Sequence, residues 1–212
     1  MQTNLEFISL GPNCHTASIL KQLKYKTCSF PFDWMLSNIN IVTSCIENDF
    51  NDFNNRNNYI QTNYNIISLK QTTVKYLDNT FVHKNPIKNK DDFDYYLRCV
   101  ERFKNLKTNN KVNIFVHTCY ENMCLTLEFK SDIILLMNVL NQKYNNYYLL
   151  ILNYVKVQNI DEPNSYNYII DDKLITINIY LMYDSEIWYS IDKSIQNFFV
   201  MFNPIKEIFN KI

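Results

Sequence analysis

Apolar residues in the second half of the chain follow two patterns that predict different elements. Consecutive apolar residues at 112–116 and 147–155 predict two strands, and the segment between them, 131–144, has the spacing of a helix capped by Ser131. Strands that are apolar nearly throughout are typical of a parallel sheet covered on both faces. We therefore expect a parallel β-α-β unit with a right-handed crossover, and residues 174–181 predict a further strand.

The first half begins with a similar short strand followed by a helix. Residues 7–10 form an apolar run that ends at a Gly-Pro pair, which predicts a buried strand leading into a tight turn. From Asn13, a favourable N-cap, apolar residues recur at helical spacing. Residues 39–50 and 90–107 predict two further amphipathic helices.

The remaining segments predict a periphery and a closing part. Aromatic and β-branched runs within residues 66–83, of which 80–83 is the last, are split by Asp78 and Asn79 and predict an antiparallel hairpin. Its strands are short and polar, so the hairpin should be peripheral. Residues 186–199 and 204–212 predict closing helices.

Together these elements predict a single α/β domain over residues 1–212. We expect three layers, with a mixed, mostly parallel central sheet, helices on both faces and the peripheral hairpin. The helices at 131–144 and 90–107 should each pack on a face of the sheet. A hydrophobic content of 47% agrees with a sizeable core.

One glycine stands among the 212 residues, and it is Gly11. Glycine suits backbone at positive φ, or a main chain that a neighbour approaches closely. The single alanine, Ala17, lies just beyond it. We therefore expect Gly11 to occupy a position that excludes a side chain.

Cys14 follows this glycine in the first turn of the predicted helix. Unpaired N–H groups and the helix dipole favour an anion there, which suits a thiolate nucleophile and an oxyanion. The alternative is a small buried side chain without chemistry, which is common for cysteine.

Charge and cysteine usage exclude several classes of protein. Twenty-one basic and 21 acidic residues balance, without a basic run, so we expect no nucleic-acid or membrane partner. The six cysteines form no zinc-binding pattern, and we expect free thiols, no metal and no cofactor. The N-terminus has no signal-peptide pattern and no apolar run is long enough to span a bilayer, which predicts a soluble cytoplasmic protein.

The motifs SLGPNC at 9–14, A-x-x-L-K at 17–21 and FPFDW at 30–34 resemble a family of bacterial and giant-virus proteins named papain-like cysteine peptidases, a domain of unknown function. The resemblance covers roughly residues 5–120. It implies a Cys–His hydrolase with Cys14 as nucleophile and His83, in the sequence FVH, as base. A papain-like fold would also place the nucleophile helix against an antiparallel sheet, whereas the periodicity here favours parallel strands.

Three histidines could serve as the base. His15 is adjacent to Cys14 on one helix and should point elsewhere. His83 and His117 each follow a predicted strand, and the carboxyl end of a parallel strand is a common ligand site. The residues alone make His83 and His117 equally good candidates for the base, and the resemblance favours His83.

Polar neighbours could complete the site in alternative ways. Asp33, between aromatic residues and next to Trp34, could orient the base or cap the backbone of its own turn. Asn13 could donate to an oxyanion or only cap its helix. Asn153 is a further candidate for the third catalytic residue, which would orient the base.

Two functions stay open. The first is a cysteine hydrolase or acyl transferase acting on an amide or ester in a small molecule, peptide or glycan. The second is a non-catalytic module that binds a phosphate or sugar nucleotide at Gly11 and the helix N-terminus. In that case Arg98 and Arg102, one turn apart, would complete the site; otherwise they form a solvated or ion-paired helix face.

Overall fold

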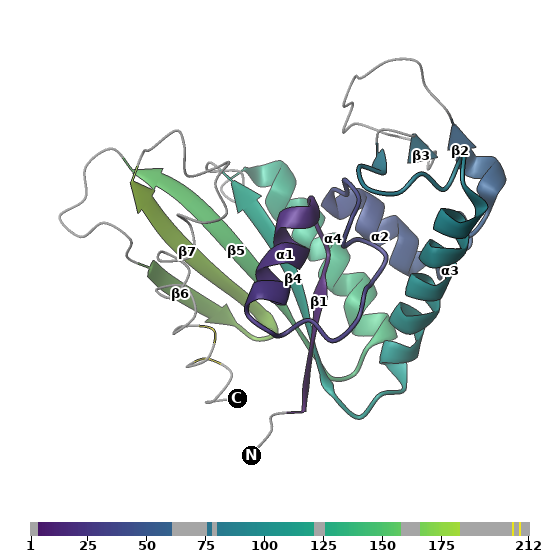
Figure 1. The fold of residues 1–212 in the computed structure, drawn as a ribbon. Helices are drawn as coiled ribbons and strands as arrows, with labels where there is room; N and C mark the ends of the chain where they lie inside the picture. The colour runs from purple at the N-terminus through teal and green to yellow at the C-terminus, as the bar shows by residue number, and fades with distance from the viewer. Residues whose placement is uncertain are drawn as a thin grey trace.

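A five-stranded sheet forms the centre of the protein (Figure 1). The computed structural model describes residues 4–60, 76–77, 80–120, 126–157, 166–182, 205 and 208. The strands lie in the order β1-β4-β5-β7-β6. Their bounds are β1 (Leu5–Ser9), β4 (Val112–Tyr120), β5 (Tyr147–Val157), β7 (Leu174–Met182) and β6 (Tyr166–Asp171).

The first four strands in this order are parallel. In register, Ile8 lies opposite Phe115, and Val116 lies opposite Leu150. β6 pairs with β7 in the antiparallel direction and closes one edge. The parallel pairing of β4 with β5 confirms the predicted β-α-β unit, and the carboxyl ends of β1 and β4 therefore lie at the same end of the sheet.

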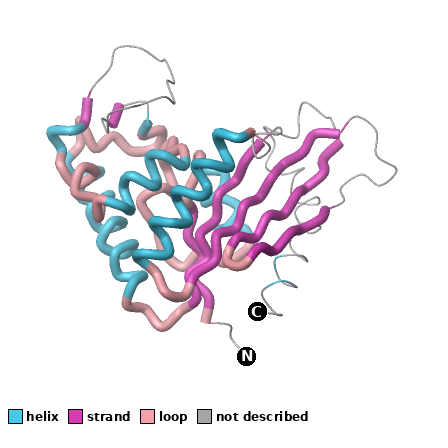
Figure 2. The backbone as a smooth tube through the Cα atoms, turned by 180° about the vertical axis from the view of Figure 1, so that it is seen from behind, coloured by secondary structure: helices cyan, strands magenta, loops and turns pink. Residues whose placement is uncertain are grey.

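Helices cover both faces of this sheet. Their bounds are α1 (Cys14–Gln22), α2 (Ile39–Glu47), α3 (Lys90–Lys104) and α4 (Leu127–Lys143). Ile19 and Leu20 of α1 pack with Val116, Leu150 and Ile177 on one face. The buried residues of the other three helices pack on the opposite face, and Figure 2 shows these helices together on one side of the molecule. The predicted three-layer α/β class is confirmed.

Two predicted boundaries were wrong because a helix and a strand extend beyond the polar residues that the sequence predicts as their ends. α4 begins at Leu127, four residues before Ser131, because the Thr126 side chain accepts the Phe129 N–H and caps the helix there. β4 continues past Val116 to Tyr120, because Thr118 and its neighbours keep their pairing with β5.

Other helices end earlier than predicted. α2 ends at Glu47, and α3 ends at Lys104, followed by the 3₁₀ turn η3 (Asn105–Lys107). A 3₁₀ turn at the end of an α-helix is common. Ile205 and Ile208 are helical, which agrees with the predicted last helix, whereas residues 186–199 lie outside the described residues.

The structure does not show the predicted antiparallel hairpin in those of its residues that are described, 76–77 and 80–83. Residues 80–83 contain a bend and no strand, while 61–75 and 78–79 lie outside the described residues. β3 (Tyr76–Leu77) pairs in parallel with β2 (Tyr59–Ile60), which follows the 3₁₀ turn η1 (Arg56–Asn58). The antiparallel pair at the edge of the main sheet is formed by β6 and β7, and β6 was not predicted.

Two further findings concern the oxidation state of the cysteines and the length of the apolar helices. Cys14, Cys28 and Cys99 are reduced, whereas Cys119 forms a disulfide, which corrects the expectation of free thiols throughout. Within the described ranges, no helix is long and apolar enough to cross a membrane.

Candidate functional site

Gly11 forms a tightly held corner between β1 and α1. Its φ of +98° lies in the region that favours glycine, and a Cβ atom built on it would lie 2.1 Å from the Ser37 Oγ. Its carbonyl accepts hydrogen bonds from the Thr16 Oγ1 at 2.6 Å and from the Thr118 N–H at 3.2 Å. The expectation that this position excludes a side chain is confirmed.

Cys14 is the first residue of α1. The Asn13 side chain accepts the His15 N–H at 2.9 Å and caps the helix, as the sequence predicts. The Cys14 thiol is half-buried and reduced. It therefore lies at the end of a helix where N–H groups and the dipole favour negative charge.

Tyr120, at the end of β4, lies next to this corner. The side chains of Thr118 and Asn13 hydrogen-bond its hydroxyl group. Burial raises the pKa of Tyr120, the two hydrogen bonds oppose that rise, and the nearby Cys14 adds to it. Sequence reasoning missed Thr118 and Tyr120 because it ended the strand at 116; their spacing of two residues on one face of β4 is the signal that could have found them.

His15 completes an aromatic group beside Tyr120. Its ring centroid lies 6.2 Å from that of Tyr120 and 5.8 Å from that of Tyr154. Burial lowers the pKa of His15. The ring thus packs among aromatic side chains on the α1 face of the sheet.

His117 lies inside β4 and does not project from the end of a strand, because β4 extends to Tyr120. It alternates with Val116 and shares the face of Phe115, which is the face opposite α1. Burial lowers its pKa to about 4, against a hydrogen bond with the Leu10 backbone that raises it. Among the described residues its Nδ1 has no hydrogen-bond partner.

His83 lies on an exposed loop and contacts Trp34. The two ring centroids are 5.6 Å apart and the rings are nearly perpendicular. The Leu36 N–H donates to the Thr80 carbonyl at 2.7 Å, and the Ser37 N–H donates to the Pro12 carbonyl at 2.8 Å. Residues 34–37 thus connect the His83 loop to the Gly11 corner, although no hydrogen bond joins the Cys14 thiol to an imidazole in the described part of the chain.

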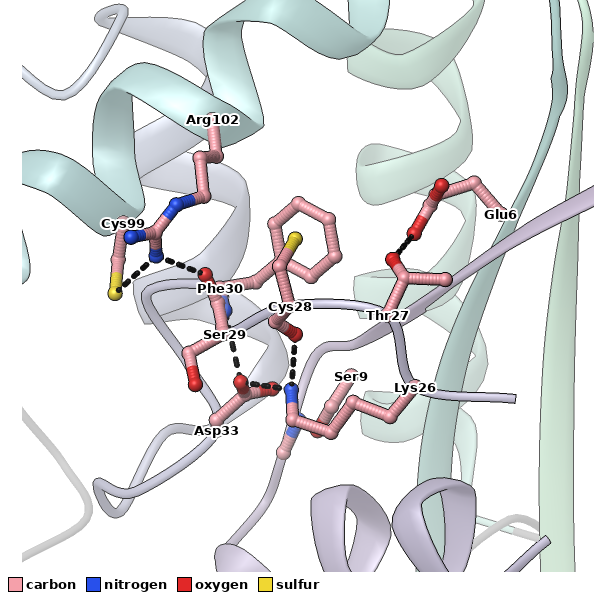
Figure 3. A network of polar contacts seen from close by, with 11 residues as sticks. Glu6, Ser9, Lys26, Thr27, Cys28, Ser29, Phe30, Asp33, Cys99 and Arg102 are labelled. Carbon is pink, nitrogen blue, oxygen red and sulfur yellow. Dashed lines mark hydrogen bonds and ion pairs between the residues drawn. The ribbon is translucent and has the colours of Figure 1, made fainter. Parts of the chain in front are cut away.

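Asp33 is fully buried and holds its own turn together. Its carboxylate pairs with Lys26 and accepts the Phe30 N–H at 2.8 Å, and Figure 3 shows Lys26 and Asp33 directed at each other. Burial raises the pKa of Asp33, and the charge of Lys26 is the main opposing effect. These contacts correspond to the structural alternative considered for Asp33.

The two arginines of α3 have different surroundings. Arg102 donates to the Ser29 carbonyl at 2.9 Å and lies 3.5 Å from the Cys99 Sγ (Figure 3), whereas Arg98 is exposed. Arg102 thus links α3 to the loop around Asp33. Asn153 donates to the Asn178 Oδ1 at 2.8 Å across β5 and β7.

In a comparison with protein families, a match covers nearly the whole chain. The model of the family described as "Putative papain-like cysteine peptidase (DUF1796)" matches residues 5–209. The chain belongs to this family. Searches of curated proteins and of solved structures found no match.

Across its described residues, this family member has no antiparallel sheet behind α1, the helix that begins with Cys14. α1 packs on a sheet whose strands β1, β4, β5 and β7 are parallel. The described ranges contain no group of three or more His, Cys, Asp and Glu side chains that could hold a metal ion.

Proposed function

We propose that the protein is a cysteine hydrolase or acyl transferase that acts on an amide or ester, with Cys14 as its nucleophile. The observation that carries this proposal is the position of Cys14 as first residue of a capped helix, directly after the Gly11 corner. A thiolate is stabilised at such a position by the helix dipole and by N–H groups without partners inside the helix. The family description supports the same chemistry.

In the proposed reaction the base takes the thiol proton of Cys14, and the sulfur attacks the substrate carbonyl carbon. A bond forms between sulfur and carbon, and the carbonyl oxygen takes the negative charge, which N–H groups at the start of α1 would stabilise. The bond to the leaving amine or alcohol then breaks as that group takes a proton from the base. Water, deprotonated by the same base, releases the acyl group from Cys14, or another acceptor takes its place.

His83 is the proposed base. It is exposed on a loop that backbone hydrogen bonds link to the Gly11 corner through residues 34–37, and Trp34 supports its ring. His117 is less suited, because burial holds its pKa at about 4 and its ring lies on the sheet face opposite α1. Asp33 is engaged with Lys26 and supports the turn that carries Trp34.

Alkylation by iodoacetamide at mildly acidic pH tests the nucleophile. Peptide mapping should find Cys14 labelled several-fold faster than Cys28, a half-buried reduced cysteine in a loop that serves as reference within the same sample. His83→Gln should slow the labelling of Cys14 and leave that of Cys28 unchanged. Equal labelling of the two cysteines in the wild-type protein would contradict the proposal.

Acyl transfer is tested separately with p-nitrophenyl acetate. The wild-type protein should release a burst of p-nitrophenol and carry an acetyl group on Cys14, detected by mass spectrometry. Cys14→Ser should abolish the burst, and Cys28→Ser should retain it. Without a burst in a folded, Cys14-reactive protein, the alternative of a non-catalytic module that binds an anion at the start of α1 would be favoured.

A further inference from the structure

Two residues at the end of β4, Thr118 and Tyr120, lie on the sheet face that carries α1. They are two positions apart on the strand, so their side chains point to the same side. Both make polar contacts with the segment that contains Cys14. The side-chain contacts are additional to the pairing of β4 with β1 and β5, which uses backbone groups.

Thr118 holds the beginning of this segment. Its N–H donates to the Gly11 carbonyl at 3.2 Å, and its Oγ1 lies 2.8 Å from the Oγ1 of Thr16 in a hydrogen bond. The Thr16 hydroxyl in turn donates to the Gly11 carbonyl at 2.6 Å. Thr16 and Thr118 are both fully buried, so these contacts are shielded from water.

Tyr120 holds the cap. Its hydroxyl is hydrogen-bonded to the Asn13 side chain and to Thr118. Asn13 accepts the His15 N–H at 2.9 Å through its Oδ1, so its amide is oriented from both sides. The Tyr120 ring is also stacked on Tyr154, with centroids 5.6 Å apart, which limits its movement.

We propose that Thr118 and Tyr120 are positioning residues that fix the Asn13 cap and thereby the orientation of Cys14 at the start of α1. This inference rests on the proposed function, since it assigns to these residues the preorganisation of the nucleophile. A capping side chain that loses its orientation no longer holds the N–H groups of the first turn in line. Negative charge on the Cys14 sulfur is then less stabilised.

The test measures the rate of Cys14 alkylation by iodoacetamide as a function of pH, with Cys28 as reference in each sample. Tyr120→Phe and Thr118→Val should each slow Cys14 by a factor of about 3 to 10 at mildly acidic pH. They should also move the pH at which its rate is half-maximal upward. Thr118→Ser, which keeps the hydroxyl, should restore the wild-type profile.

Matched controls remove similar groups elsewhere. Tyr147→Phe deletes a hydroxyl that donates to the Met137 carbonyl at the other end of the sheet, and Thr43→Val deletes one that donates within α2. Both controls should lower the melting temperature slightly without changing the Cys14 profile. A purely structural role of Thr118 and Tyr120 would make their variants resemble these controls, or would speed the labelling of several cysteines together through local unfolding.

The outcomes separate this inference from the function it depends on. Wild-type Cys14 that reacts no faster than Cys28 overturns both. A reactive Cys14 whose pH profile is unchanged in Tyr120→Phe overturns the positioning role alone and leaves the proposed function standing. Because Tyr120 is only half-buried, its Phe variant decides the matter even where the fully buried Thr118→Val fails to fold.

Discussion

Ser37 fills the space that a side chain at Gly11 would need. A Cβ atom at Gly11 would lie 2.1 Å from the Ser37 Oγ and 2.9 Å from the Ser37 carbonyl oxygen. Ser37 has little freedom to withdraw, because its N–H donates to the Pro12 carbonyl at 2.8 Å and its hydroxyl donates to the Leu10 carbonyl at 3.1 Å. The contact therefore fixes the corner that precedes Cys14.

Gly11→Ala should destabilise the protein by more than the roughly 1–3 kcal/mol of a strained backbone conformation, because the clash with Ser37 is added to the positive φ. Urea unfolding measures the change. The double variant Gly11→Ala with Ser37→Gly removes the clash with the hydroxyl and should recover only part of the loss, since the φ of +98° and the Ser37 carbonyl remain. A neutral Gly11→Ala variant would show that the corner relaxes without cost.

The start of α4 gives a prediction about a single cap. Thr126→Ala removes the side chain that accepts the Phe129 N–H and should cost about 1 kcal/mol. Ser131→Ala should be neutral or slightly stabilising, because Ser131 lies inside the helix, where alanine is the better helix former. Thermal unfolding of the two variants compares the positions directly, and the opposite order of effects would place the helix start at Ser131.

The parallel sheet could be predicted because its strands are buried on both faces and their apolar runs are continuous. Residues 112–116 and 147–155 carry this pattern, and β4 and β5 form as the pattern predicts. The extension of β4 through His117 and Thr118 was not predicted, because the apolar run stops at Val116. Backbone pairing with β5 continues there, since it does not depend on apolar side chains. β6 was not predicted for a related reason: nearly all of its side chains are exposed, so buried and exposed positions do not alternate along it.

Those parts of the candidate site that depend on local backbone geometry could be predicted from the residue type alone. Gly11 and the Asn13 cap follow from backbone geometry, and both were found from the sequence. The location of a long-range partner does not follow in this way: Tyr120 reaches Asn13 only because β4 lies beside β1. The pairing of Asp33 with Lys26 likewise depends on how the loop between α1 and α2 folds back on itself.

Lys26 gives a prediction about a buried ion pair. Lys26→Met leaves the fully buried Asp33 carboxylate without its cation and should cost about 3–5 kcal/mol. Adding Asp33→Asn should recover much of the loss, because the variant then buries an amide and no charge. Urea unfolding gives the free energies of unfolding of both.

The control for this pair is Lys90→Met. Lys90 pairs with Asp94 one turn along α3, but its side chain is 77% exposed, compared with 8% for Lys26. Its loss should change the free energy of unfolding by no more than about 1 kcal/mol. Similar effects of Lys26→Met and Lys90→Met would mean that Asp33 is solvated or finds another cation.

His117 makes stability depend on pH in a defined window. Burial lowers its pKa to about 4 in the folded protein, whereas its ordinary value is 6.5. Between these values the unfolded chain holds a proton on His117 that the folded protein lacks, so unfolding takes up a proton. Stability should therefore fall as the pH falls from 6.5 towards 4, by about 3 kcal/mol in all, and should lose nothing more from this group below that.

His117→Gln tests this dependence, because glutamine does not titrate and keeps a donor for the Leu10 carbonyl. Urea unfolding across this pH range should give a flatter profile for the variant than for the wild-type protein, with the largest difference between the two slopes inside the window. His83→Gln, which makes the same substitution at an exposed histidine, is the control. An equally steep profile in His117→Gln would mean that other groups cause the acid sensitivity and that His117 is protonated in the folded protein as easily as in the unfolded chain.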